Sequence, residues 1–422
     1  MGYSGVKGGM DAILAAERLV RRKRGAAPWS AAAAIIESYR LAVDRIMGEA
    51  GLYDEAIAAD AFRQAEGDLV EAAHLVRAYR SSLPQLAVST PADPGEMTVL
   101  RRIVPASRTP GGPQLLGRTT DYTARVLERP DGPEASEPAQ EKPPAGGPDE
   151  GLRRPGRFYE QLLKADLAVA HEELADDPEP FDVSRGAARP PAPRSAVLAS
   201  MARAETGALI ALWYRSIRGP DGAFHEVTLG ELRHGRLPVR VVHPLTGNPV
   251  EIGRIRATEA EAIEDLDGPA EDRTRLDVGY GLCFGHNERK AIAMANLDIA
   301  CRRAALADGG GDELEQLLLL TTDGLDSGGF LDHLKLPHYV TFRSIVDRKL
   351  AGRAALADAE GASGRAGAEG AGSAGGAEGP GGRDSGGAER AGEAGYERKP
   401  AGRAGRGAGG AGVTRNSFGE RL

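Results

Sequence analysis

Two histidines in the last quarter of the sequence have the types and spacing that could bind a metal. His333 and His338 are two of eight histidines, and Pro337 stands between them. A separation of five residues would place the two rings on different faces of a helix, and Pro337 disfavours helix at the residue before it. We therefore expect a kinked loop in which both imidazoles could bind one zinc, iron or copper ion.

The alternative is that these histidines pack against the protein or face solvent without a metal. Zinc sites use three or four protein ligands, and this stretch offers two. A third ligand would have to come from elsewhere in the chain or from another protein.

A second stretch, residues 277–290, is typical of a strand, a tight turn at Gly285 and a helix capped by Asn287. Arg289 and Lys290 follow in the first helical turn. Free backbone N–H groups, the helix dipole and two cations would together favour a bound anion. A plain connection between a strand and a helix is the alternative.

The sequence has two further glycine-rich segments, and the one at residues 110–117 gives a weak signal for phosphate binding. The chain opens with GVKGG at residues 5–9, and residues 110–117 form a turn-rich loop before a helix expected from about residue 119. Such a loop can hold a phosphate against a helix N-terminus. It lacks the Gly-Lys-Ser/Thr ending of a P-loop, so it does not by itself indicate a nucleotide site.

Residues 1–87 predict a helical N-terminal domain. Helices are expected over residues 11–24, from Ser30 to about Glu49, and from Asp68 to Tyr79. Ser30 and Asp68 are suitable N-caps, and Gly51 would end the second helix.

The remainder predicts an α+β fold with a small antiparallel sheet. Residues 88–129 form a mixed segment with a strand near 100–104, and the Pro-, Glu- and Gly-rich insert 130–156 is expected to be disordered. The α+β body covers residues 157–350, and the Gly/Ala-rich tail 351–422 is expected to be disordered.

Within this body the local patterns predict individual elements. Helices are expected over residues 158–174 and 200–217. Three short alternating runs predict an antiparallel hairpin or meander over residues 225–229, 238–242 and 251–255.

The composition bounds the class of protein. The chain has 422 residues, of which 41% are hydrophobic and 27% charged, as in soluble globular proteins. A net charge of −8 argues against a nucleic-acid partner. Two cysteines, no apolar run of membrane-spanning length and no signal-peptide pattern lead us to expect a cytoplasmic protein that does not enter the membrane.

Many short segments, in the same order along residues 1–350, resemble the PhnI family, which is subunit I of the bacterial carbon–phosphorus lyase complex. Together they are specific, although each alone would be weak. The segments are GVKGG (5–9), LAVDRIM (41–47), LVRAYR (75–80), QLLG (114–117), DYT (121–123), GYGL (279–282), FG (284–285), ERKA (288–291) and HLKLPHY (333–339).

The resemblance implies a transferase of phosphonate breakdown. Such a subunit displaces adenine from MgATP with methylphosphonate, giving α-D-ribose 1-methylphosphonate 5-triphosphate. Alone, it would act as a nucleosidase that converts ATP or GTP to the base and ribose 5-triphosphate. A non-catalytic scaffold subunit of the same complex is the alternative.

The resemblance also implies partners and metals. The family forms a core complex with subunits G, H and J and acts with subunit L, and subunit K is a further candidate partner. The metal ligands of the family match His333 and His338, near the contact with subunit J. These two histidines would hold Zn²⁺ or another transition metal. Mg²⁺ would enter with ATP.

The implied reaction sets the residue types that a site must contain. Cleavage of the N-glycosidic bond builds positive charge on the ribose, which a carboxylate would stabilise, and the leaving base needs a proton. Phosphate groups need cations and Mg²⁺. The catalytic candidates are Asp121, Tyr122, Glu288 and His225. The substrate-binding candidates are Lys7, Gly8, Gly9, Gly285, Arg289 and Lys290.

Two alternatives stay open at this point. Glu288 stands in the first turn of the expected helix, where it could serve only as a helix cap. His286 lies beside the turn but does not belong to the recurring segments, and it is left out of the predicted site.

Overall fold

A computed structural model describes the chain in two compact units, Met1–Tyr339 and Val340–Leu422, each treated by itself below. The described residues are 9–24, 31–119, 121, 127, 152–153, 156–168, 179–218, 228–265, 274–306, 311–321, 324–335 and 339–369.

Helices make up the start of the first unit, as the sequence predicts. They are α1 (Gly9–Arg24), α2 (Ala32–Ser38), α3 (Arg40–Ala50), α4 (Glu55–Gln64) and α5 (Leu69–Ser81). Helices α2 to α5 enclose a core that includes Ile35, Val43, Met47, Phe62 and Val76.

The predicted caps explain where these helices start and stop. Asp68 accepts hydrogen bonds from the backbone of Val70 and Glu71, and Gly51 ends α3 in the left-handed conformation at φ 66°. The single helix expected from Ser30 to Glu49 is wrong, because the backbone leaves the helical region at Tyr39 (φ −115°, ψ 38°). The break lets α2 and α3 pack as separate helices around one core.

An antiparallel sheet forms the centre of this unit, in the order β2-β1-β3-β4-β5. This confirms the predicted α+β fold with an antiparallel sheet. The strands are β1 (Thr98–Ile103), β2 (Leu152–Arg153), β3 (Thr228–Val242), β4 (Pro249–Asp265) and β5 (Leu276–Phe284).

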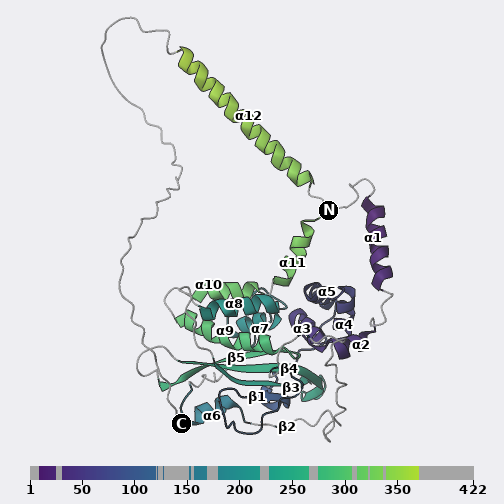
Figure 1. Cartoon of the computed structure of the whole chain (residues 1–422), viewed down its shortest axis with the longest axis vertical. Coiled ribbons are helices and arrows are strands. Elements are labelled where there is room, and N and C mark those ends of the chain that lie inside the picture. The colour runs from purple at the N-terminus through teal and green to yellow at the C-terminus, as the bar shows by residue number, and fades with distance from the viewer. Residues whose placement is uncertain are drawn as a thin grey trace, which may run out of the picture. The chain divides into compact units, whose positions relative to one another are not determined.

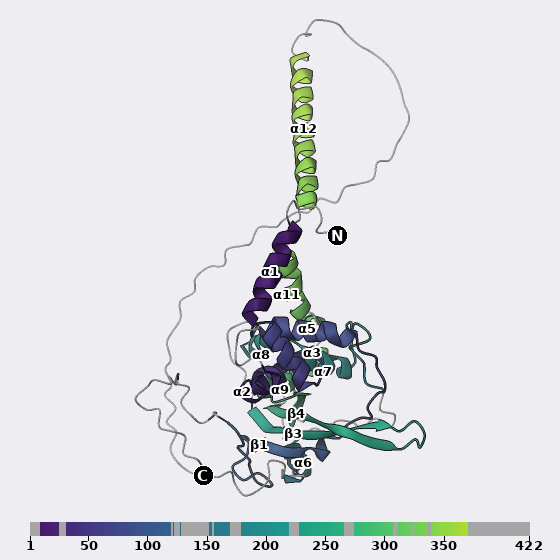
Figure 2. The same ribbon diagram turned by 90° about the vertical axis from the view of Figure 1, so that its right-hand side faces the viewer.

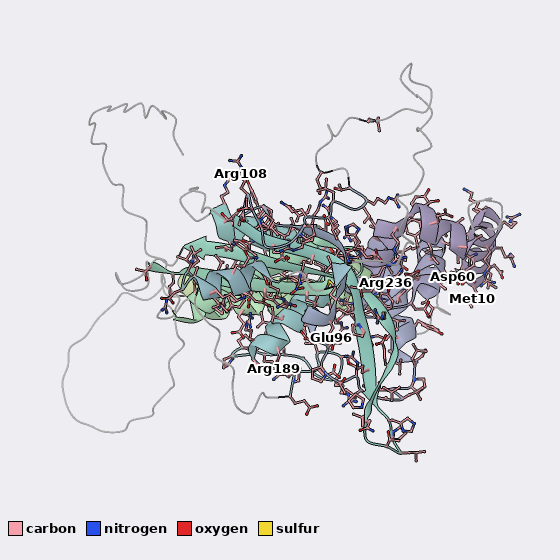
Figure 3. All side chains as sticks on the ribbon, turned by 90° about the horizontal axis from the view of Figure 1, so that it is seen from below. Met10, Asp60, Glu96, Arg108, Arg189 and Arg236 are labelled. Carbon is pink, nitrogen blue, oxygen red and sulfur yellow. The ribbon has the colours of Figure 1, made fainter. Side chains whose placement is uncertain are left out.

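Of the two predicted arrangements, hairpin or meander, the structure has one long antiparallel hairpin. Strand β3 runs without a turn from Thr228, within the first predicted run, to the end of the second run at Val242, and it pairs with β4 along this length. Pro238 is tolerated within β3 because pairing with β1 stops at Arg236, so no β1 residue needs a hydrogen bond from position 238. Figure 3 shows the hairpin extending beyond Arg236, away from the rest of the sheet.

Helices cover the two faces of the sheet unequally. One face carries four of the described helices, which are α7 (Arg194–Arg203), α8 (Thr206–Arg218), α9 (Glu288–Leu306) and α10 (Gly311–Leu320). The other face carries the short α6 (Phe158–Lys164) (Figures 1 and 2).

Two predicted helices differ from those of the structure. The helix predicted over residues 158–174 ends at Lys164 in α6, and the helix predicted over residues 200–217 is divided between α7 and α8.

Close packing of α9 on β5 depends on glycine. A Cβ atom at Gly279 would lie 1.9 Å from the backbone oxygen of Ala295, and one at Gly281 would lie 2.2 Å from that of Ala291. Any side chain there would push the helix away from the strand. The glycines therefore fix the position of α9, and with it the turn that precedes the helix.

Helix α11 (Gly324–His333) ends the described part of the first unit apart from a short turn and Tyr339. Asp332 and His333 are helical, which corrects the loop expected there, while residues 336–338 lie outside the described range. No described helix is long and apolar enough to span a bilayer.

Helix α12 (Tyr339–Glu369) accounts for the described part of the second unit. Residues 351–369 were expected to be disordered and are helical, because this alanine-rich stretch favours helix without needing a packed face. Its side chains from Thr341 to Ala362 are exposed. Residues 370–422 lie outside the described range.

Candidate active site

Arg101 brings two of the predicted catalytic carboxylates together. It lies on β1 and is 2% exposed. Its guanidinium group donates to both Asp121 and Glu288 and also to the backbone oxygen of Leu116. Burial alone would lower the pKa of Arg101, but hydrogen bonds and charge from Glu288 and Asp121 raise it. Arg101 is therefore a fixed cation that orients two carboxylates from distant parts of the chain.

Glu288 is held in its ionised form. Burial would raise its pKa, but hydrogen bonds from His286 and Arg101 lower the pKa to about 2. Nε2 of His286 lies 3.0 Å from Oε1 of Glu288. A carboxylate that is charged at neutral pH and oriented from two sides is suited to stabilise developing positive charge.

A second histidine lies against the first. The rings of His234 and His286 stack with centroids 4.4 Å apart and planes 15° apart. Nδ1 of His234 lies 3.1 Å from the hydroxyl of Thr258. Burial, and then the neighbouring His286, lower the pKa of His234 to about 3, so its ring is neutral at physiological pH.

The turn between β5 and α9 positions His286 and Glu288. Gly285 adopts φ 72°, and a Cβ atom there would lie 2.5 Å from Cβ of Asp44 on α3. The backbone N–H of His286 donates to Asp44 at 3.0 Å, and the side-chain amide of Asn287 donates to the backbone oxygen of Asp44 at 3.0 Å. The predicted strand–Gly285–helix arrangement is confirmed, and α3 holds it in place.

A cavity of about 420 Å³ opens beside these groups. This volume is within the range of small-molecule sites. Its lining comes from α2, α3, α4, β1, the loop after β1, the long hairpin and the β5–α9 turn. The lining residues are Ile36, Glu37, Arg40, Glu55, Leu100, Arg101, Gly117, Arg118, His234, Arg256 and His286.

The arginines of this cavity fall into two kinds. Arg40 is paired with Asp44 at 2.6 Å and with Glu55 at 2.7 Å, and Arg101 is paired as described above. Arg118 and Arg256 have no ion pair among the described residues. The cavity therefore offers two cations to a ligand while the other two orient carboxylates.

The other predicted residues are not gathered here. Arg289 is exposed on α9. Lys290 is 1% exposed, and its ammonium group donates to the backbone oxygen of Ala204 at 2.8 Å. Burial lowers the pKa of Lys290 to about 8. The two cations expected to share one anion at the start of α9 therefore point to different places.

Several predicted residues lie elsewhere or outside the described range. Gly9 is the first residue of α1 and does not line the cavity. His333 ends α11 with its ring stacked on Phe330 at 6.4 Å between centroids. The residues outside the described range are Lys7, Gly8, Tyr122, His225 and His338, and their roles stay predictions.

Comparisons with known proteins identify the family to which the chain belongs. Residues 2–354 match the family model described as "Bacterial phosphonate metabolism protein (PhnI)". The chain is 40% identical over 370 residues to the "Putative C-P lyase subunit protein HtxH" of Stutzerimonas stutzeri, an alignment that covers 82% of this chain and 95% of that relative.

Two further relatives carry the name "Alpha-D-ribose 1-methylphosphonate 5-triphosphate synthase subunit PhnI". The one from Rhizobium meliloti (strain 1021) is 36% identical over 371 residues, covering 86% of this chain and 98% of the relative. The one from Escherichia coli (strain K12) is 37% identical over 347 residues, covering 81% and 96%. This chain therefore belongs to the PhnI family of bacterial phosphonate metabolism proteins.

Proposed function

We propose that this chain acts in phosphonate breakdown as the subunit that displaces adenine from MgATP with methylphosphonate. The product would be α-D-ribose 1-methylphosphonate 5-triphosphate, the compound in the names of two relatives. The observation that carries the proposal is the ionised Glu288, which contacts His286, because both stacked histidines line a cavity that also offers Arg118 and Arg256.

Glu288 is our choice for the group that stabilises the ribosyl transition state. As the bond from C1′ to the base breaks, positive charge spreads over C1′ and the ring oxygen. An oriented carboxylate in a partly buried site lowers the energy of that charge. Asp121 shares Arg101 with Glu288, but it is the more exposed of the two side chains (40% against 20%), so Glu288 is the better shielded from water.

His286 is our choice for the proton donor to the departing base. It lines the cavity, and its Nε2 lies 3.0 Å from Oε1 of Glu288. A protonated imidazole could give its proton to adenine as the bond breaks. His234, which is neutral, would support the ring of His286 by stacking.

Arg118 and Arg256 are our choice for the anionic groups of the substrates. Arginine forms paired hydrogen bonds with phosphate oxygens. Mg²⁺, bound to the triphosphate as part of the substrate, would neutralise further charge. Methylphosphonate would then approach C1′ without strong repulsion from the triphosphate.

The experiment is an adenine-release assay with phosphorus NMR of the products. Purified chain with subunits G, H and L, given MgATP and methylphosphonate, should release adenine and form a new phosphonate ester. The isolated chain, given MgATP or MgGTP alone, should release the base and form ribose 5-triphosphate. Assembled protein that yields neither adenine nor the ester would refute the proposal.

A scaffold function is the second candidate, and the long hairpin favours it. Leu245 at its tip is 90% exposed and Ile252 is 63% exposed, which suits contact with another subunit. The two candidates differ in one result. Base release by the isolated wild type that is lost in a folded Glu288→Gln variant would exclude a purely structural role.

A transition metal at His333 and His338 also stays a proposal. Among the described residues, no three His, Cys, Asp or Glu side chains gather as a metal site, and His338 lies outside them. We expect a partner such as subunit J to supply further ligands. His333→Ala and His338→Ala should each lower the metal content of the complex with G, H and J. Unchanged metal content in the double variant, measured by elemental analysis, would rule this site out.

A further inference from the structure

A second cavity, of about 570 Å³, lies between α5, α7, α10, α11 and the loop at residues 183–188. None of its lining residues lines the candidate active site. Four arginines reach it, namely Arg77 and Arg80 from α5, Arg185 from the loop and Arg203 from the end of α7. The family resemblance assigns no ligand to this cavity.

Arg80 and Arg203 approach each other at Gly51. A Cβ atom on Gly51 would lie 2.9 Å from Nη1 of Arg80 and 3.0 Å from Nε of Arg203. Nη1 of Arg80 makes a long hydrogen bond of 3.4 Å to the backbone oxygen of Gly51. Nε and Nη1 of Arg203 are buried and have no hydrogen-bond partner among the described residues.

A buried guanidinium N–H without a partner is costly, because it has lost water and gained nothing in return. Nearby carboxylates do not supply the missing contacts. Asp326 lies 3.7 Å from Arg77 and 3.4 Å from His74, and Asp182 lies 3.4 Å from Arg185. Both carboxylates are about half exposed, so water weakens their effect on the buried cations.

The pKa values of Arg80 and Arg203 are both lowered, which agrees with this lack of acidic partners. Burial lowers the pKa of Arg80. Burial, and then the charges of Arg80 and Arg77, lower the pKa of Arg203 to about 10. An anion between them would offset both effects.

We propose that this cavity binds a small anion with a tetrahedral phosphorus group, held between Arg80 and Arg203. Guanidinium groups bind phosphate and phosphonate oxygens in pairs. The side chains of Ser184 and Ser200 also line the cavity and add hydroxyl groups. The volume leaves room for an organic group attached to the phosphorus.

The test is calorimetric titration of the full chain with inorganic phosphate, and separately with methylphosphonate, at constant ionic strength set with sodium chloride. The wild type should bind both anions. Arg203→Gln and Arg80→Gln should each weaken binding by roughly tenfold or more, because each removes charged hydrogen bonds. Two variants are used so that a folding defect in one does not decide the result.

Arg215→Gln is the matched control, because Arg215 is an exposed arginine on α8, paired with Glu313, that lines neither cavity. It should bind phosphate as the wild type does. Arg256→Gln tests the other cavity. Binding that survives in both Arg203→Gln and Arg80→Gln but is lost in Arg256→Gln would overturn the proposal, as would no binding by the wild type. Binding of phosphate but not methylphosphonate would assign the site to phosphate itself.

Discussion

Two arginine-lined cavities in the same unit differ in how their guanidinium groups are paired. In the candidate active site, Arg40 and Arg101 each bind two carboxylates, and hydrogen bonds with those acids raise the pKa of both arginines against the effect of burial. In the second cavity, Arg80 and Arg203 have few partners, and burial lowers the pKa of both.

This difference separates two uses of arginine. A paired arginine is a structural cation that fixes carboxylates where chemistry needs them, and removing it leaves buried negative charge. An arginine without acidic partners has hydrogen-bonding capacity left for a ligand, at some cost to the empty protein. Substitutions should therefore have opposite consequences in the two cavities.

The largest effect should follow Glu288→Gln. The amide keeps the size of the side chain but removes the charge, so adenine release should fall by roughly 100-fold or more. The assay is initial-rate base release from MgATP. Glu313→Gln, at an exposed carboxylate on α10, should leave the rate unchanged. An active Glu288→Gln variant would remove this carboxylate from the mechanism.

Unfolding in urea should distinguish the paired from the unpaired arginine. Arg101→Gln should lower the free energy of unfolding by about 2 kcal/mol or more, because Glu288 and Asp121 lose their shared partner. Arg203→Gln should change it by less than about 0.5 kcal/mol or raise it, because a poorly solvated cation is removed.

The control is Arg254→Gln, which removes an exposed arginine paired with Glu251 and should cost less than about 0.5 kcal/mol. Equal losses for Arg101→Gln and Arg203→Gln would contradict the distinction between the two cavities.

The ion pair between Glu288 and Arg101 should make the free energy of unfolding depend on pH. Its pKa is lowered from 4.5 to about 2 in the folded protein. Stability from this group is therefore complete above pH 4.5 and is lost as the pH falls towards 2. The difference in unfolding free energy between wild type and Glu288→Gln should shrink by roughly 1–2 kcal/mol between pH 6 and pH 3. A difference independent of pH would contradict the ion pair.

The smallest effect should follow Arg289→Gln. Arg289 is exposed on the first turn of α9 and lines neither cavity. We expect less than about a twofold change in adenine release, since exposed charges are well screened. A loss near that of Glu288→Gln would mean that the substrate contacts Arg289 at the start of α9, as the sequence predicts.

Local signals in the sequence were enough to predict parts of this fold. The strand before Gly285 and the helix after it follow from side-chain alternation, a glycine turn and an asparagine next to the helix start. The Asp68 cap and the Gly51 stop are likewise short-range effects. The break at Tyr39 could not be predicted, because it depends on how α2 and α3 pack with α4 and α5.

The candidate site was predictable only in part, because its pairing is long-range. Asp121 and Glu288 were identified by residue type, but the arginine that joins them looked like an ordinary strand residue. His234 falls between the two runs that the sequence predicts as separate strands, 225–229 and 238–242, whereas the structure has one continuous strand there. No sequence pattern indicates that Nε and Nη1 of Arg203 lack hydrogen-bond partners. That lack depends on which acceptors the neighbouring segments place around this side chain.

A structure of Glu288→Gln with MgATP tests the central claim most directly, because the variant should bind substrate and turn it over slowly. We predict C1′ of the ribose beside residue 288 and His286, with the triphosphate contacting Arg118 and Arg256. A nucleotide bound instead between Arg80 and Arg203, with the cavity lined by His286 empty, would contradict the assignment of the active site.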